Sequence, residues 1–135
     1  MAVVGLGALG LPMAINLRRA GYRLNVHTRS RLAESSAELV DDQGPTVTSS
    51  SSPKEAVYGC AVLLICVSDD AAVEAVLWGD GGAGYALTPG SLVIDCSTIA
   101  PATAEAMAKR LAERNLHYID APVTGGTEGA KEGTL

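Results

Sequence analysis

The sequence of 135 residues contains no phenylalanine, one tryptophan and four tyrosines, so aromatic rings contribute little to its core. Alanine, valine and leucine in short runs make up much of the 47% hydrophobic content. An aliphatic core of this kind is typical of a parallel sheet that is buried on both faces. A single domain of this length is large enough to bury a sizeable core.

Basic residues are scarce as well: ten lysines and arginines face fifteen aspartates and glutamates, which gives a formal net charge of −5. This balance argues against a general surface for nucleic acid or acidic membranes, although it leaves room for a local phosphate site. No apolar stretch is long enough to span a bilayer, and no basic segment precedes the first apolar run as in a secretory signal. We therefore expect a cytoplasmic protein with no membrane or nucleic-acid partner.

The three cysteines, Cys60, Cys66 and Cys96, are an odd number and lack the spacing of a metal site. We expect them to be reduced and mostly buried, and we expect no bound metal. No motif ties either histidine, His27 or His117, to a cysteine, so a catalytic cysteine has little support.

The most informative segment lies at the N-terminus. Residues 2–10 read Ala-Val-Val-Gly-Leu-Gly-Ala-Leu-Gly, an apolar strand that breaks into Gly-x-Gly-x-x-Gly. In a dinucleotide site, Gly5 would allow the tight turn, Gly7 the approach of the pyrophosphate, and Gly10 the close packing of helix on strand. The following helix would offer free N–H groups and its positive end to the anion. A glycine-rich turn without a ligand is the alternative, and the motif's position between strand and helix disfavours it.

Strand and helix patterns alternate along the rest of the chain. They predict strands over residues 3–4, 22–28, 46–48, 61–67, 92–95 and 116–119, and helices over 12–20, 31–42, 69–77 and 101–114, with a short helix that Ser52 caps and Pro53 begins. Gly21 is the expected end of the first helix, and the glycine-rich tail over 120–135 receives no element. The rhythm predicts a doubly wound parallel α/β sheet that binds ligand at the carboxyl ends of its strands.

The second strand ends at Thr28-Arg29-Ser30, about 20 residues after the glycines. An acidic residue at this place would accept a hydrogen bond from the ribose 2′-OH of NAD. Arg29 with two hydroxyl neighbours suits a 2′-phosphate instead, because a guanidinium can bind phosphate through two N–H groups. The sequence thus favours NADP and leaves NAD possible. The alternative for Arg29 is an ordinary solvated arginine at a helix start.

Three later strand ends carry polar residues that serve either as helix caps or turns, or as ligand contacts. Ser68 and Asp69 precede the helix over 69–77, and residues 95–98 (Asp-Cys-Ser-Thr) shortly precede Pro101. In residues 124–126 (Thr-Gly-Gly), a hydroxyl and backbone N–H groups would suit a small anionic substrate. Spacing alone leaves both interpretations open at each site.

Taken together and in order, these segments resemble the β-hydroxyacid dehydrogenase family, which includes 3-hydroxyisobutyrate dehydrogenases and glyoxylate/succinic semialdehyde reductases. The matching segments cover essentially the whole chain: residues 5–17, 28–30, 76–79 (Val-Leu-Trp-Gly), 95–98, 120–126 (Asp-Ala-Pro-Val-Thr-Gly-Gly) and 128–130. The resemblance implies hydride transfer between a nicotinamide cofactor and a small β-hydroxy acid or its aldehyde or keto partner. It also implies a homo-oligomeric parent protein.

The resemblance assigns a role to each matching position. It implies a cofactor site at Gly5, Leu6, Gly7, Ala8, Leu9, Gly10, Thr28, Arg29, Ser30, Val67, Ser68 and Thr98, and a substrate site at Thr124, Gly125 and Gly126. Within this pattern Leu9 stands where methionine is usual, Thr28 where asparagine is frequent, and Thr124 where serine is more usual. The second departure leaves the choice between NADP and NAD somewhat open.

The family's catalytic lysine has no counterpart in the chain, because Lys54, Lys109 and Lys131 do not match its motif. The family also continues into an all-helical second domain. We therefore expect residues 1–135 to be a dinucleotide-binding domain, truncated near its C-terminal end and inactive alone. Two alternatives stay open: a stand-alone dinucleotide-binding module without catalysis, and an imine reductase, which shares the fold and the glycine turn.

Overall fold

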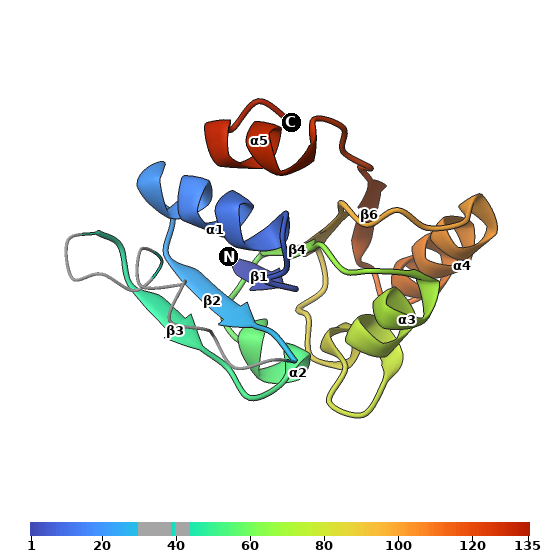
Figure 1. The fold of residues 1–135 in the computed structure, drawn as a ribbon. Coiled ribbons are helices and arrows are strands. Elements are labelled where there is room, and N and C mark those ends of the chain that lie inside the picture. The colour runs from blue at the N-terminus through green and yellow to red at the C-terminus, as the bar shows by residue number, and fades with distance from the viewer. Residues whose placement is uncertain (30–38, 40–43) are drawn as a thin grey trace.

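The computed structural model describes residues 1–29, 39 and 44–135, and these form a six-stranded parallel sheet in the order β3-β2-β1-β4-β5-β6 (Figure 1). The strands are β1 (Ala2–Val4), β2 (Leu24–His27), β3 (Val47–Ser49), β4 (Val62–Ile65), β5 (Leu92–Asp95) and β6 (His117–Asp120). The helices are α1 (Gly10–Arg19), α2 (Pro53–Ala56), α3 (Asp70–Trp78), the 3₁₀ turn η2 (Ala83–Tyr85), α4 (Pro101–Ala112) and α5 (Gly126–Glu132). The doubly wound α/β prediction is confirmed. Ser30 and all of the predicted helix over 31–42 except Leu39 lie outside the described residues.

The strand order reverses at β1, which pairs with β2 on one side and β4 on the other. Residue Val4 therefore stands beside both His27 and Ile65 in the register of the sheet. In open parallel sheets such a switch point leaves a crevice outside the carboxyl ends of the strands, because the two flanking connections lead to opposite faces.

Alternate residues of the strands supply two aliphatic cores, one on each face of the sheet. Val3, Leu24 and Val26 pack with Ala14 under α1. Val4 and Ile65 pack with residues of α2, α3 and α4 on the opposite face. Figure 1 shows this division, with α1 and α5 on one side of the sheet and the other helices across it. The predicted burial on both faces follows from these two cores.

Local capping chemistry sets two helix starts, one predicted at Ser52 and one left open at Asp69. The Ser52 hydroxyl accepts a hydrogen bond from Glu55 N at 3.1 Å, and Pro53 begins α2. The Asp69 carboxylate accepts one from Ala72 N at 2.8 Å at the start of α3. Gly21, with φ of +97°, follows the end of α1. Such side chains satisfy N–H groups that a helix leaves unpaired in its first turn.

Two expectations need correction. Residues 95–98 do not cap α4 as one interpretation of their polar side chains allowed, because the N-cap position is occupied by Ala100, whose side chain makes no capping hydrogen bond. The tail contains α5, to which the sequence pattern assigned no element. Glycines lower intrinsic helix propensity, so α5 depends on tertiary contacts, chiefly with α1.

Candidate dinucleotide-binding site

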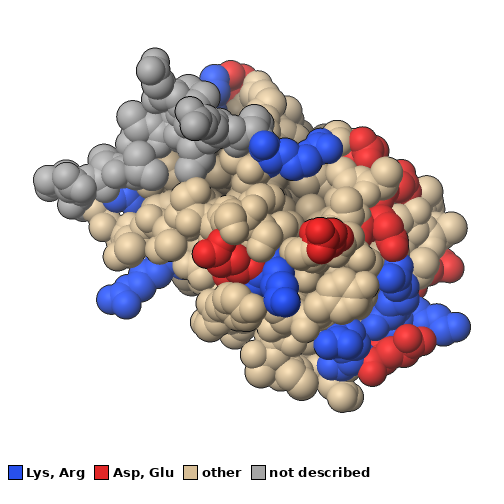
Figure 2. Space-filling view, turned by 90° about the horizontal axis from the view of Figure 1, so that it is seen from below, with Lys and Arg blue, Asp and Glu red and all other residues tan. Residues whose placement is uncertain are grey.

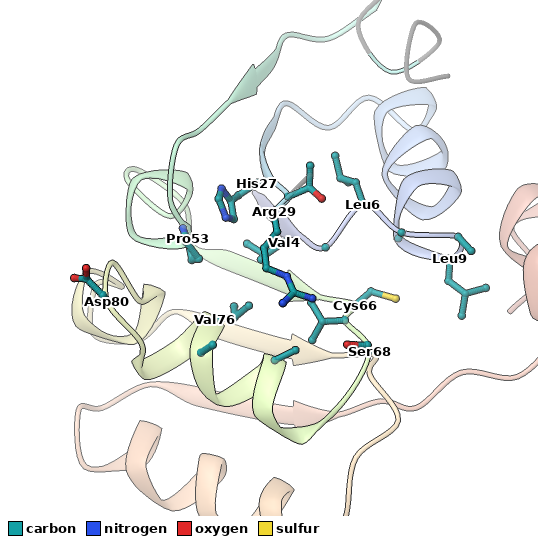
Figure 3. Close-up of a pocket in the computed structure, with 18 residues that line it drawn as sticks. Val4, Leu6, Leu9, His27, Arg29, Pro53, Cys66, Ser68, Val76 and Asp80 are labelled. Carbon is teal, nitrogen blue, oxygen red and sulfur yellow. The ribbon is translucent and has the colours of Figure 1, made fainter. Parts of the chain in front are cut away.

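A pocket of about 550 Å³ opens at the carboxyl ends of β1, β2 and β4, at the switch point of the sheet (Figure 3). Ten of the residues that the sequence assigned to the cofactor line it: Gly5, Leu6, Gly7, Ala8, Leu9, Gly10, Thr28, Arg29, Val67 and Ser68. The fold thus gathers three strand ends that lie far apart in the sequence around a single cavity.

The three glycines of the first turn meet three different steric conditions. Gly5 has φ of +94°, and a Cβ there would lie 2.2 Å from the carbonyl oxygen of Cys66. A Cβ on Gly10 would lie 1.9 Å from the carbonyl oxygen of Gly5. A Cβ on Gly7 would meet nothing within 4 Å, although Gly7 lines the pocket. Gly5 and Gly10 are therefore required by the protein itself, whereas Gly7 leaves space in the cavity.

Helix α1 begins at this turn with its N-terminal end free of side-chain capping. Leu9 occupies the N-cap position and makes no side-chain hydrogen bond, and the first turn holds no acidic residue. Helices α2 and α3, in contrast, are capped by Ser52 and Asp69. The positive end of the α1 dipole thus faces the pocket without a competing carboxylate, an arrangement that favours an anion.

Arg29 brings a positive charge to the pocket from the end of β2. Its side chain points into the cavity, toward the side on which Cys66 and Ser68 lie (Figure 3). Hydrogen bonds from the Ser68 hydroxyl and from Ala72 N lower the pKa of Asp69, and the charge of Arg29 lowers it further. The field of Arg29 therefore reaches across to the start of α3.

The pocket also includes residues that sequence reasoning did not assign to it: Val4, His27, Pro53, Cys66, Ala72, Ala75, Val76 and Asp80. The helical spacing of Ala72 and Val76 after a strand end was a usable signal, because one face of α3 must border the crevice. Nothing near Asp80 or Pro53 in the sequence marks them, since Pro53 begins α2 and Asp80 follows α3, both distant in sequence from the glycine turn. His27 Nδ1 lies 3.0 Å from the carbonyl oxygen of Ser50, which fixes the ring beside β3.

Four predicted site residues stand apart from this pocket. Thr98, beyond β5, is exposed and does not line it. Thr124, Gly125 and Gly126 are exposed as well and lead into α5 beyond β6. They share the carboxyl edge of the sheet with the pocket but belong to strands on the far side of β4.

The pocket wall contains Cys66, which is half-buried, while Cys60 and Cys96 are buried. Burial and the nearby Asp95 carboxylate raise the pKa of Cys66. In the part of the chain that the structure describes, no three His, Cys, Asp or Glu side chains gather in a metal-binding group. No helix in that part is long and apolar enough to cross a membrane.

The whole chain, residues 1–135, matches the family model described as the NAD binding domain of 6-phosphogluconate dehydrogenase. Among named relatives, NAD-dependent L-serine dehydrogenase of Pseudomonas aeruginosa is 40% identical over all 135 residues, which cover 44% of that protein. The 2-hydroxy-3-oxopropionate reductase of Escherichia coli is 38% identical over the same span, again 44% of its length. The chain therefore spans less than half the length of these relatives.

Solved structures agree with this assignment. A 3-hydroxyisobutyrate dehydrogenase of Mycobacterium tuberculosis with L-serine superposes with a TM-score of 0.85 and 30% identity, over 97% of this chain and 42% of that one. Psf3 in complex with NADP+ and 2-OPP gives the same TM-score at 31% identity, over 98% of this chain and 45% of that one. The resemblance to β-hydroxyacid dehydrogenases is thus confirmed. The chain belongs to the family of the NAD-binding domain of 6-phosphogluconate dehydrogenase, alongside relatives that are β-hydroxyacid dehydrogenases.

Proposed function

We propose that residues 1–135 bind a nicotinamide dinucleotide in the pocket at the switch point and prefer NADP(H) to NAD(H). The observation that carries this proposal is the pairing of a glycine cradle, open at Gly7, with the guanidinium of Arg29 inside the same cavity. The pyrophosphate would lie against the cradle and the positive end of α1. Arg29 would bind the 2′-phosphate of the adenosine ribose through charge-assisted hydrogen bonds.

The chain's residues fit a dinucleotide on chemical grounds. The cradle supplies backbone N–H groups, Arg29 supplies charge, and Val67 and Val76 supply apolar wall. Thr28 and Ser68 add hydroxyl groups at two strand ends. Among relatives and structural neighbours, one is named as NAD-dependent and another is a complex with NADP+. We assign the choice between the two cofactors to the residues at the end of β2.

For the reaction, we propose hydride transfer involving a small β-hydroxy acid or its aldehyde or keto partner, within a larger homo-oligomeric protein. Bound nicotinamide would supply or accept the hydride, while residues 1–135 bind it, orient it and exclude water along the apolar wall. Thr124, Gly125 and Gly126 would hold the acid group of the substrate. We assign no proton donor to this chain, because Lys54, Lys109 and Lys131 are exposed and none of them lines the pocket. Residues 1–135 alone are therefore expected to bind cofactor without turnover.

Replacement of Arg29 tests the cofactor preference. Arg29→Ala should weaken NADPH binding about 10- to 100-fold, because hydrogen bonds to a charged phosphate are lost. NADH binding should change little, since NADH has no 2′-phosphate. Isothermal titration calorimetry of both cofactors against wild type and variant measures the two effects.

Arg110→Ala is the matched control for Arg29→Ala. Arg110 lies on α4, where it pairs with Glu74 and stacks 4.5 Å from the ring centre of Trp78, and it does not line the pocket. Its removal should leave both affinities unchanged. Equal affinity of the wild-type chain for NADPH and NADH would contradict the preference for NADP, and binding of neither cofactor would contradict the proposed function.

Imine reduction is a second candidate. An imine reductase from Pseudomonas sp. superposes with a TM-score of 0.73 and 27% identity, over 95% of this chain and 42% of that one. The likeness to structures named 3-hydroxyisobutyrate dehydrogenase is closer in both measures. Turnover of succinic semialdehyde against turnover of a cyclic imine by the complete protein would separate the two, with the semialdehyde expected to be the substrate reduced.

A further inference from the structure

Three polar side chains form a connected group beside the pocket without lining it: Asp95, Ser97 and Tyr118. Asp95 ends β5 and is 0% exposed, Ser97 follows it at 2%, and Tyr118 lies on the neighbouring strand β6. Buried polar groups of this kind are expensive unless each finds a partner. Their partners therefore indicate what the group holds in place.

The Asp95 carboxylate uses both of its oxygens within the group. Oδ1 accepts a hydrogen bond from Ser97 N at 2.9 Å, and Oδ2 accepts one from the Tyr118 hydroxyl at 3.1 Å. Burial and the charge of Asp95 raise the pKa of Tyr118, so the phenol stays protonated and continues to donate. Asp95 thus orients the backbone of Ser97 and is itself oriented from β6.

Ser97 connects this hydrogen-bonded group to the pocket. Its hydroxyl oxygen accepts a hydrogen bond from Val67 N at 3.0 Å. Val67 lines the pocket next to the glycine turn, and a Cβ added at Gly5 would lie only 2.8 Å from its Cγ1. The Ser97 hydroxyl therefore holds the backbone of a residue that packs directly against the turn proposed to bind the pyrophosphate.

The segment from β4 to α3 is tied at three successive points. Cys66 N donates to the carbonyl oxygen of Val4 at 3.0 Å, Val67 N donates to Ser97, and Asp69 caps α3. The first tie is a sheet hydrogen bond, and the third belongs to the helix. The middle tie depends on the side chain of Ser97, from the segment that follows β5, so a single substitution there removes it.

We propose that Ser97 is a positioning residue of the dinucleotide site, set by Asp95 and Tyr118, whose hydroxyl fixes the Val67 wall at its working distance from the glycine turn. The inference rests on the proposed function, because the affinity that Ser97 controls is that for nicotinamide dinucleotide. Since the wall contacts the shared part of both cofactors, loss of the tie weakens NADPH and NADH in the same proportion. That pattern differs from the one expected for Arg29.

The experiment compares Ser97→Ala with Ser91→Ala in the full 135-residue chain. Ser91 is likewise buried, at 4% exposure, but lies just before the amino end of β5, away from the pocket. Both variants lose one buried hydroxyl. Ser97→Ala should weaken NADPH and NADH about five- to tenfold each, because a buried N–H of the pocket wall loses its partner. Ser91→Ala should stay within about twofold of wild type, as expected for a site that shares no partner with the pocket.

Amide hydrogen exchange without nucleotide gives a second and independent measurement. Ser97→Ala should speed exchange at Val67, whose N–H is released, while Cys66, still bonded to Val4, keeps its protection. Tyr118→Phe removes one hydrogen bond from Asp95 and should produce a smaller change of the same kind. It serves as the test variant if Ser97→Ala does not fold.

Cofactor affinities of Ser97→Ala equal to those of Ser91→Ala would overturn the inference, as would unchanged exchange at Val67. A selective loss of NADPH alone would also overturn it, since the wall would then act on the 2′-phosphate. Absence of cofactor binding by the wild-type chain would overturn the proposed function instead. The two failures are distinguishable, because exchange at Val67 is read without any nucleotide.

Discussion

At the scale of single residues, Gly7 and Gly10 belong to one motif but have different steric surroundings. A side chain at Gly10 would overlap the backbone of Gly5, whereas a side chain at Gly7 would enter open space in the pocket. The spacing of the motif predicted both roles. The structure adds that only one of them concerns folding, because only Gly10 is crowded by the protein itself.

Alanine substitutions should separate these two roles. Gly10→Ala should lower the free energy of unfolding by about 1–3 kcal/mol, as expected for an overpacked site. Gly7→Ala should leave stability nearly unchanged but weaken NADPH binding about tenfold or more, because the methyl group occupies space that the pyrophosphate needs. Urea denaturation and calorimetric titration measure the two quantities. Equal losses of stability in both variants would contradict this division.

At the scale of elements, two asparagines hold helices in place on opposite faces of the sheet. Asn16 on α1 donates from Nδ2 to the carbonyl oxygens of Ala130 at 2.8 Å and Lys131 at 3.2 Å, near the end of α5. Asn25 on β2 donates in the same way to those of Ala56 at 2.9 Å and Tyr58 at 3.3 Å, at the end of α2. Each amide satisfies carbonyl groups that a helix leaves unpaired in its last turn.

Removing each amide should loosen one helix and spare the other. Asn16→Ala should speed amide exchange in α5, because its carbonyl partners and its attachment to α1 are lost, while α2 is unchanged. Asn25→Ala should do the reverse and serves as the matched control. Hydrogen exchange resolved by residue measures both. Equal loosening of α2 and α5 by either variant would show that the contacts are not local.

Elements with local sequence signals were predictable, and α5 was not. Strand β5 has the predicted limits, and Ser52, Asp69 and Gly21 act at helix ends as their residue types indicate. Helix α5 contains Gly126 and Gly129, and its buried residues are Gly129 and Ala130. Its stability comes from Asn16 and from contact with α1, and the Asn16–Ala130 hydrogen bond joins residues that are 114 positions apart in sequence. No local sequence pattern therefore predicts this helix.

At the scale of the whole molecule, the net negative charge does not gather on one surface in the view of Figure 2. On that face, basic and acidic side chains are interspersed among uncharged ones. Several carboxylates are instead engaged locally. Hydrogen bonds from the Ser51 hydroxyl and amide lower the pKa of Glu55, and hydrogen bonds from Thr103 and Ala100 N lower that of Asp70. Asp69 behaves in the same way at the start of α3.

Stability should therefore fall in acid. These carboxyls bind protons less readily in the native chain than in the unfolded chain, so stability is complete above their ordinary pKa of about 4 and is lost as the pH falls below it. Asp69→Asn should keep the cap, because asparagine caps as well as aspartate, but it cannot titrate. Its Tm should thus lie below that of wild type at pH 7, because the charge that Ser68, Ala72 N and Arg29 favour is lost, and should approach it between pH 5 and 3. Thermal unfolding at several pH values measures this, and parallel declines would contradict it.

The amino-acid sequence by itself determined the alternating strands and helices, the glycine turn, the helix caps and the arginine after β2, because each depends on residues that are neighbours along the chain. The tertiary structure decided which strand ends share the pocket. With β1 between β2 and β4, the glycine turn meets Arg29 and Val67, while Thr98 and Thr124 stand apart beyond β5 and β6. The bond from Val67 N to Ser97 spans 30 residues and exists only because β4 and β5 pair. Such contacts follow from strand order and packing, which no local pattern contains.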